Sequence, residues 1–89
     1  MTFGLGKTDI HIDCKMDPKL DQNGTAYWSF SKGGKMAALP WGTSFYRTDS
    51  NTTLRLRIDI LHHTQIGQYT CTLDQLKKTI LVQAGEPSL

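Results

Sequence analysis

The amino-acid sequence predicts an all-β domain, a sandwich or barrel of short strands, and three observations carry this prediction. Apolar and polar residues alternate with a period of two in several separate stretches, which is typical of strands that bury one face. Clusters of Gly, Pro, Asn and Asp separate these stretches and predict turns. No helical periodicity extends beyond a single turn, except around residues 61–65.

The N-terminal half contains two clear strands and two weaker ones. The first clear strand carries two isoleucines and a cysteine on one face, with acidic and histidine side chains on the other. In the second, Trp28 and Phe30 share a face. A weak strand follows the turn at Gly33-Gly34 and ends before Pro40, and a short strand comes next. The expected strands are residues 9–14, 26–30, 35–39 and 44–47.

The C-terminal half contains the cleanest alternation of the chain. In residues 53–60, four aliphatic side chains face one way, while two arginines and an aspartate face the other. Residues 68–73 alternate again, with Tyr69 and Cys71 in phase, and residues 79–83 form the last strand. About seven or eight short strands separated by turns are therefore expected.

The size and charge of the chain exclude several classes of function and structure. Its 89 residues make one small domain, which buries roughly 60–65% of the surface of its unfolded chain, so a covalent cross-link would help its thin core. The ten Lys and Arg residues are scattered and the net charge is only +2, which does not support a nucleic-acid partner. No apolar run approaches the roughly 20 residues needed to cross a bilayer.

Two cysteines, Cys14 and Cys71, lie near opposite ends of the chain. They are too few for a structural zinc site of four ligands, but they allow one disulfide. Such a bond would close a loop of about 57 residues, which the chain-entropy estimate values at roughly 4 kcal/mol. The spacing alone fits two free buried thiols in a cytosolic protein equally well.

Acceptor patterns for N-glycosylation begin at Asn23 and Asn51, and both favour an extracellular protein.

The order of Cys14, Trp28, Tyr69 and Cys71 resembles that of an immunoglobulin-superfamily domain. In that family the two cysteines pair across two sheets, the tryptophan packs on the bond, and the tyrosine forms a corner with the backbone upstream of it. The resemblance implies an immunoglobulin-like Greek-key β-sandwich of about 7–9 strands with one inter-sheet disulfide. Further core positions match in register: Leu56, Ile58, Leu61 and Gly67.

The resemblance covers roughly residues 6–84. The immunoglobulin-like domain is expected over residues 1–84, and residues 85–89 are expected to begin a linker to a following domain. There are departures from the family. Gln65 stands where many members place an aspartate that pairs with an arginine, so that salt bridge is absent. The Phe-Gly-x-Gly strand of antigen receptors is missing, and the segment at residues 74–77 is short. The resemblance is therefore to a V-set-like or intermediate I-set domain of a cell-surface receptor or adhesion molecule.

No enzyme is expected, and neither a cofactor nor a metal. The adjacent His62 and His63 would point to opposite faces of a strand, whereas paired metal ligands usually share a face. A second cluster combines His11 with Asp9 and Asp13 on one strand face. Charge pairing with the arginines of a neighbouring strand explains that cluster without chemistry.

The resemblance implies an extracellular recognition module, on the outer side of the plasma membrane, that binds another immunoglobulin-like domain in adhesion or in self or immune recognition. Binding could be homophilic or heterophilic, and a membrane would be reached only through other parts of a longer chain. The alternatives are a secreted or viral immunomodulatory decoy and a structural spacer. Trp41 and Phe45 could contact a partner, or they could cover the open end of the core. The candidate contact residues are Tyr27, Ser29, Met36, Trp41, Gln68, Thr70 and Leu81.

Overall fold

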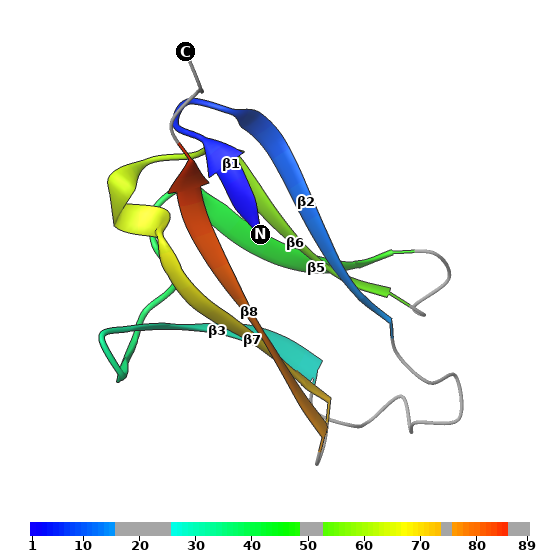
Figure 1. Cartoon of the computed structure of the whole chain (residues 1–89). Coiled ribbons are helices and arrows are strands. Elements are labelled where there is room, and N and C mark those ends of the chain that lie inside the picture. Colours follow the sequence, from blue (N-terminus) through cyan, green and yellow to red (C-terminus); the bar gives the residue numbers. More distant parts are fainter. Residues whose placement is uncertain (16–25, 49–52, 74–75, 86–89) are drawn as a thin grey trace.

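The computed structural model describes residues 1–15, 26–48, 53–73 and 76–85, which form eight strands in two facing sheets (Figure 1). The only helical element in this part of the chain is a single 3-10 turn, η1 (His63–Gln65). No helix among the described residues is long and apolar enough to span a membrane.

The larger sheet has five strands in the order β1-β8-β7-β3-β4. All neighbours in it are antiparallel except β1 and β8, which run parallel. Its strands are β1 (Thr2–Gly4), β3 (Ala26–Lys32), β4 (Lys35–Ala37), β7 (Gly67–Leu73) and β8 (Leu76–Gly85).

The smaller sheet has three antiparallel strands in the order β2-β6-β5. They are β2 (Thr8–Lys15), β5 (Thr43–Thr48) and β6 (Thr53–Ile60). The chain crosses from one sheet to the other after β1, after β2, after the β3–β4 hairpin, and again after the β5–β6 pair. This path is an immunoglobulin-like Greek-key sandwich, so the predicted fold class is confirmed.

The core lies between the sheets and follows the period-two pattern of the sequence. In β2 the burial alternates strictly, with Ile10, Ile12 and Cys14 inside. In β6, Leu56 and Ile58 are completely buried. Further buried apolar residues come from β3, β6, β7, β8 and the segment after β6: Trp28, Phe30, Leu54, Leu61, Tyr69, Cys71, Leu73 and Val82.

Several elements differ from the predictions. Strand β1 was not expected, because three residues are too few to show an alternation; its pairing with β8 and the packing of Phe3 against the core define it. Strand β4 is shorter than predicted, and β8 is longer at both ends because it pairs with β7 down to the hairpin. Strand β8 ends at Gly85, one residue beyond the expected domain limit. Ile60 was expected to be buried with the other aliphatic residues of β6, but it is 43% exposed at the strand end.

Candidate recognition surface

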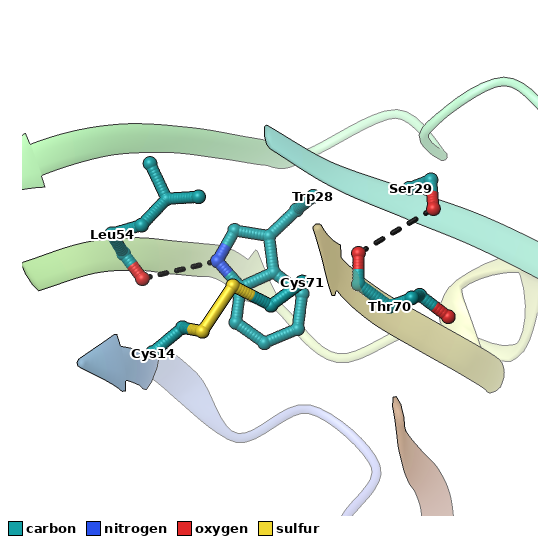
Figure 2. The surroundings of a disulfide bond; sticks show 6 residues. All are labelled: Cys14, Trp28, Ser29, Leu54, Thr70 and Cys71. Carbon is teal, nitrogen blue, oxygen red and sulfur yellow. Dashed lines mark hydrogen bonds between the residues drawn. A yellow bond between two sulfur atoms is a disulfide. The ribbon is translucent and has the colours of Figure 1, made fainter. Parts of the chain in front are cut away.

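The disulfide between Cys14 and Cys71 joins β2 of the smaller sheet to β7 of the larger one (Figure 2). Beside it lies the indole of Trp28, which is 3% exposed and donates a hydrogen bond from Nε1 to the carbonyl of Leu54 at 3.1 Å. The indole N–H is therefore satisfied inside the core, as a buried tryptophan requires. Together the bond and the indole fix β3 and β7 against the smaller sheet.

A second fixed point lies in the turn before β7. Tyr69 is fully buried and its hydroxyl donates to the carbonyl of Gln65 at 2.6 Å, which is the tyrosine corner that the resemblance implied. Burial raises the pKa of the Tyr69 phenol well above its usual value. At the start of β7, a Cβ on Gly67 would lie 2.7 Å from the Phe30 ring, so this position needs a glycine. The predicted core residues all lie at this junction or in the sandwich interior.

The outer face of the larger sheet carries six of the seven candidate contact residues. Strand register places them in rows that run across the sheet, because directly opposite residues share a face. One row joins Tyr27, Thr72 and Lys77, and the next joins Ser29, Thr70 and Thr79. The third row contains Met36, Ser31, Gln68 and Leu81, one from each of β4, β3, β7 and β8. We call these three rows the outer face.

The centre of the outer face is lined by hydroxyl and amide groups that bond to one another. The hydroxyls of Thr70 and Thr79 lie 3.0 Å apart. Ser29 donates to the carbonyl of Thr70 at 3.4 Å (Figure 2), and Ser31 donates to the Gln68 side chain at 3.5 Å. These side chains are ordered by their neighbours, so little rotamer entropy is left to lose when a partner covers them.

Apolar side chains surround this polar centre. Met36 is 75% exposed, Leu81 is 42% exposed and Tyr27 is 38% exposed. The three rows contain one charged residue, Lys77, at a corner of the face. The centre of the outer face lacks charged residues, as the cores of protein interfaces do, while its apolar residues lie at the margin and not at the centre.

Trp41 lies outside the outer face. It stands between β4 and β5, and its carbonyl accepts a hydrogen bond from the Gln65 side chain at 2.7 Å, which places it beside the turn before β7. Its side chain is 83% exposed, so it does not cover the end of the core. Phe45 lies opposite buried Leu56 on the core side of edge strand β5. The structure therefore assigns different positions to these two aromatic residues: Trp41 is exposed to solvent, and Phe45 lies on the core side of its strand.

The side chain of Gln65 forms hydrogen bonds at the position where the sequence lacks a salt-bridging aspartate. It is fully buried, and its Oε1 accepts from the backbone N–H of His62 at 2.7 Å while its Nε2 donates to Trp41. A Cβ on Gly42 would lie only 2.8 Å from that Nε2, and Gly42 has a φ of +82°. The close approach and the left-handed backbone both require glycine there. A neutral amide thus connects the turn before β7 to the segment between β4 and β5.

The outer side of the smaller sheet is charged. Arg55 forms a two-pronged salt bridge with Asp13 at 2.7 and 3.1 Å, and Arg57 bridges Asp9 at 2.8 Å and Asp59 at 2.7 Å. This confirms the predicted cross-strand pairing of β2 and β6. The two broad faces of the sandwich therefore differ sharply in chemistry, one neutral and one made of ion pairs.

The salt bridge of Asp13 gives a testable pH dependence. A hydrogen bond from Arg55 holds the pKa of the Asp13 carboxyl below its usual value, against a smaller opposing effect of burial. Because the folded pKa is the lower one, the stabilisation is present above the unfolded pKa and disappears as the pH falls through the folded pKa. Arg55→Gln should raise the midpoint of the Asp13 carboxyl titration, followed by NMR, towards the ordinary value of about 3.9.

The matched control is Arg47→Gln, which removes the same charge from the same sheet. Arg47 forms no salt bridge with the described part of the chain. An equal rise of the Asp13 midpoint in this variant would show that net charge, and not the contact with Arg55, sets the pKa.

The outer face also contains residues that were not among the candidates. Thr72 lies on the outer face by register but is only 5% exposed. Ser31 and Thr79 belong to the outer face although neither was a candidate, and the same alternation that selected Ser29 and Thr70 could have found them. Asn23 and Asn51 lie outside the described residues, so their glycosylation stays a prediction.

His62 and His63 are exposed in the turn before β7, with their rings edge to face. Over the described ranges, no three His, Cys, Asp or Glu side chains gather closely enough to hold a metal ion.

No protein-family model matches the chain, and a search of curated proteins gives no significant match. The fold and surface thus define the class: a small disulfide-linked β-sandwich with an immunoglobulin-like path and one neutral face.

Proposed function

We propose that this chain is an extracellular immunoglobulin-superfamily domain of a cell-surface receptor or adhesion molecule, and that its outer face binds the same face of a second copy. The observation that carries the proposal is the contrast between the two broad sides. The outer side of the smaller sheet carries ion pairs between β2 and β6, whereas the outer face combines a neutral centre with exposed Met36, Leu81 and Tyr27. Desolvating the neutral face costs less, because no charge must leave water at its centre.

The row at Met36 supports a second copy as the partner. Across the sheet its side chains read apolar, polar, polar, apolar: Met36, Ser31, Gln68, Leu81. A two-fold axis in the interface, parallel to the strands and between β3 and β7, would set Met36 of one copy against Leu81 of the other. It would also set Ser31 against Gln68. Such an axis keeps the strands of the two copies aligned, as face-to-face sheets prefer.

The test compares two leucine-sized residues that are equally exposed on different sheets. Leu81 is 42% exposed on the outer face, and Ile60 is 43% exposed on the smaller sheet. Leu81→Glu should weaken self-association, measured by analytical ultracentrifugation, by well over tenfold, because the two-fold places the new charge in two apolar contacts. Ile60→Glu should associate like the unchanged domain.

Beads coated with the domain provide the adhesion readout. Coated beads should aggregate, Leu81→Glu beads should not, and Met36→Glu should reproduce the Leu81 defect because the two residues meet across the axis. A strictly monomeric domain whose beads stay dispersed would overturn homophilic recognition, and so would an equal loss of association in Ile60→Glu.

A further inference from the structure

A small cavity opens at the side of the sandwich, next to the corner of the outer face at which Lys77 lies. Its volume is about 180 Å³, and it lies beside the disulfide that joins the sheets. One wall belongs to β2 and the other to β7 and β8. The lining residues are Cys14, Lys15, Cys71, Leu73, Lys77 and Lys78. The cavity therefore combines an apolar disulfide floor with three cationic residues.

Lys78 is out of place by the pattern of its strand. It lies directly opposite Cys71, whose side chain forms the disulfide, so Lys78 stands on the inner side of the sheet. The next inner positions of β8 are Ile80, which packs against the core, and Val82, which is fully buried. At this inner position a solvent-exposed lysine lines the cavity, where the pattern of the strand would place a buried apolar side chain.

Among the residues that the structure describes, the main chain beside Lys78 is also unpaired on one side. Strand β1 covers β8 only at Gln83–Gly85, where Gln83 donates its N–H to Met1, and the Met1 ammonium donates to the Leu81 carbonyl at 2.7 Å. Main-chain groups alternate between the two edges of a strand, so those of Thr79 and Lys77 point to this same edge. Within the described residues they have no ladder partner there.

The charges around the cavity select the ligand. No carboxylate lines it among the described residues, and the carboxylate of Asp13, the last acidic residue of β2, is held by Arg55 on the outer side of that sheet. We propose that an extended acidic peptide segment adds to the free edge of β8 beside Lys77–Thr79 and places a carboxylate side chain in the cavity near Lys78. Main-chain hydrogen bonds would supply the pairing, and the lysines would supply the specificity for acidic side chains.

A peptide fits these features better than an anionic polysaccharide does. A sulfated sugar chain would use the lysines, but it has no regularly spaced amide groups to pair with the free edge. An inward lysine near an edge also has a purely protective use, since it discourages pairing with other chains. The two roles differ in what they predict for the edge amides when the peptide is added. The binding role predicts slower hydrogen exchange, and the protective role predicts no change.

The experiment titrates the domain with a capped peptide of alternating glutamate and valine. We expect saturable binding by calorimetry, and slower hydrogen exchange at the Lys77 and Thr79 amides by NMR. Lys78→Gln and Lys78→Glu should weaken binding by about tenfold or more, because the contact between charges is lost or reversed. Lys32→Glu, which changes the same charge at the β3–β4 hairpin, should bind like the unchanged domain.

Three results would overturn the proposal. The first is no binding of the acidic peptide together with self-association of Lys78→Gln, which would assign Lys78 to edge protection. The second is tight binding of a heparin-derived oligosaccharide with no peptide-induced protection of the two amides, which would assign the lysines to a polysaccharide. The third is equal weakening by Lys32→Glu and Lys78→Glu. The outer-face variant Leu81→Glu separates this site from homophilic binding, since its loss of self-association should leave peptide binding intact.

Discussion

Replacing Cys14 and Cys71 together with alanine should lower the free energy of unfolding by about 4 kcal/mol. The bond closes a loop with a sequence separation of 57 residues, so its loss restores much entropy to the unfolded chain. It also removes the disulfide cross-link between the side chains of the two sheets, beside the buried indole of Trp28. Against the 5–15 kcal/mol typical of domains, this loss brings the fold close to its stability limit.

Urea unfolding of the oxidised domain, the double-alanine variant and the domain with a reducing agent measures this effect. The last two should agree closely, since both lack the bond. The fluorescence of Trp28 follows the environment of the cross-link directly, and Trp41→Phe removes the emission of the exposed indole. An unfolding midpoint unchanged by reduction would contradict a structural role for the disulfide.

Gln65→Ala should cost about 2–4 kcal/mol of stability, because it leaves two backbone groups without their buried partner. These are the N–H of His62 and the carbonyl of Trp41, each 2.7 Å from the Gln65 amide. The turn before β7 would then lose its connection to the segment that carries Trp41. A neighbouring effect on the tyrosine corner is expected, since Tyr69 bonds the backbone of the same residue.

Two controls sharpen this result. Gln68→Ala removes an exposed glutamine of the outer face and should change stability by less than about 0.5 kcal/mol. Gln65→Glu keeps an acceptor for the His62 N–H, but it loses the donor to Trp41 and buries a carboxylate beside that carbonyl, so it should cost at least as much as Gln65→Ala. Chemical denaturation gives all three values. A Gln65→Ala variant as stable as Gln68→Ala would show that water replaces the amide at no cost.

Most of the fold could be predicted because most of its strands show an alternating pattern in their own local sequence. The alternation in β2 and β6 reflects one buried and one solvated face, and both strands form where expected. Strand β1 could not be found this way, since its three residues become a strand only through their contact with β8, which is distant in sequence. The exposure of Ile60 also depends on where a strand end lies relative to its neighbours, which alternation does not encode.

The candidate surface was predictable in part for a similar reason. Alternation decides which side of a strand a residue occupies, so it found Tyr27, Ser29, Gln68 and Leu81. It cannot decide how strands align, and only the register shows that Met36 and Leu81 end the same row. Trp41 belongs to a turn, where no periodicity applies, and its place follows from the hydrogen bond of Gln65. The cavity could not be inferred before the two sheets were placed together, and Lys78 lay outside the strand expected at residues 79–83.

The parallel pairing of β1 with β8 has a mechanical consequence. Met1 lies beside Leu81, while the last residue of β8 pairs with the last residue of β1 (Figure 1). Tension between the two ends of the domain would therefore pull these strands along their length in opposite directions. The hydrogen bonds between them run across the pulling direction, so they would bear the load together and not open one after another. This short ladder would act as a shear clamp at which forced extension of the domain begins.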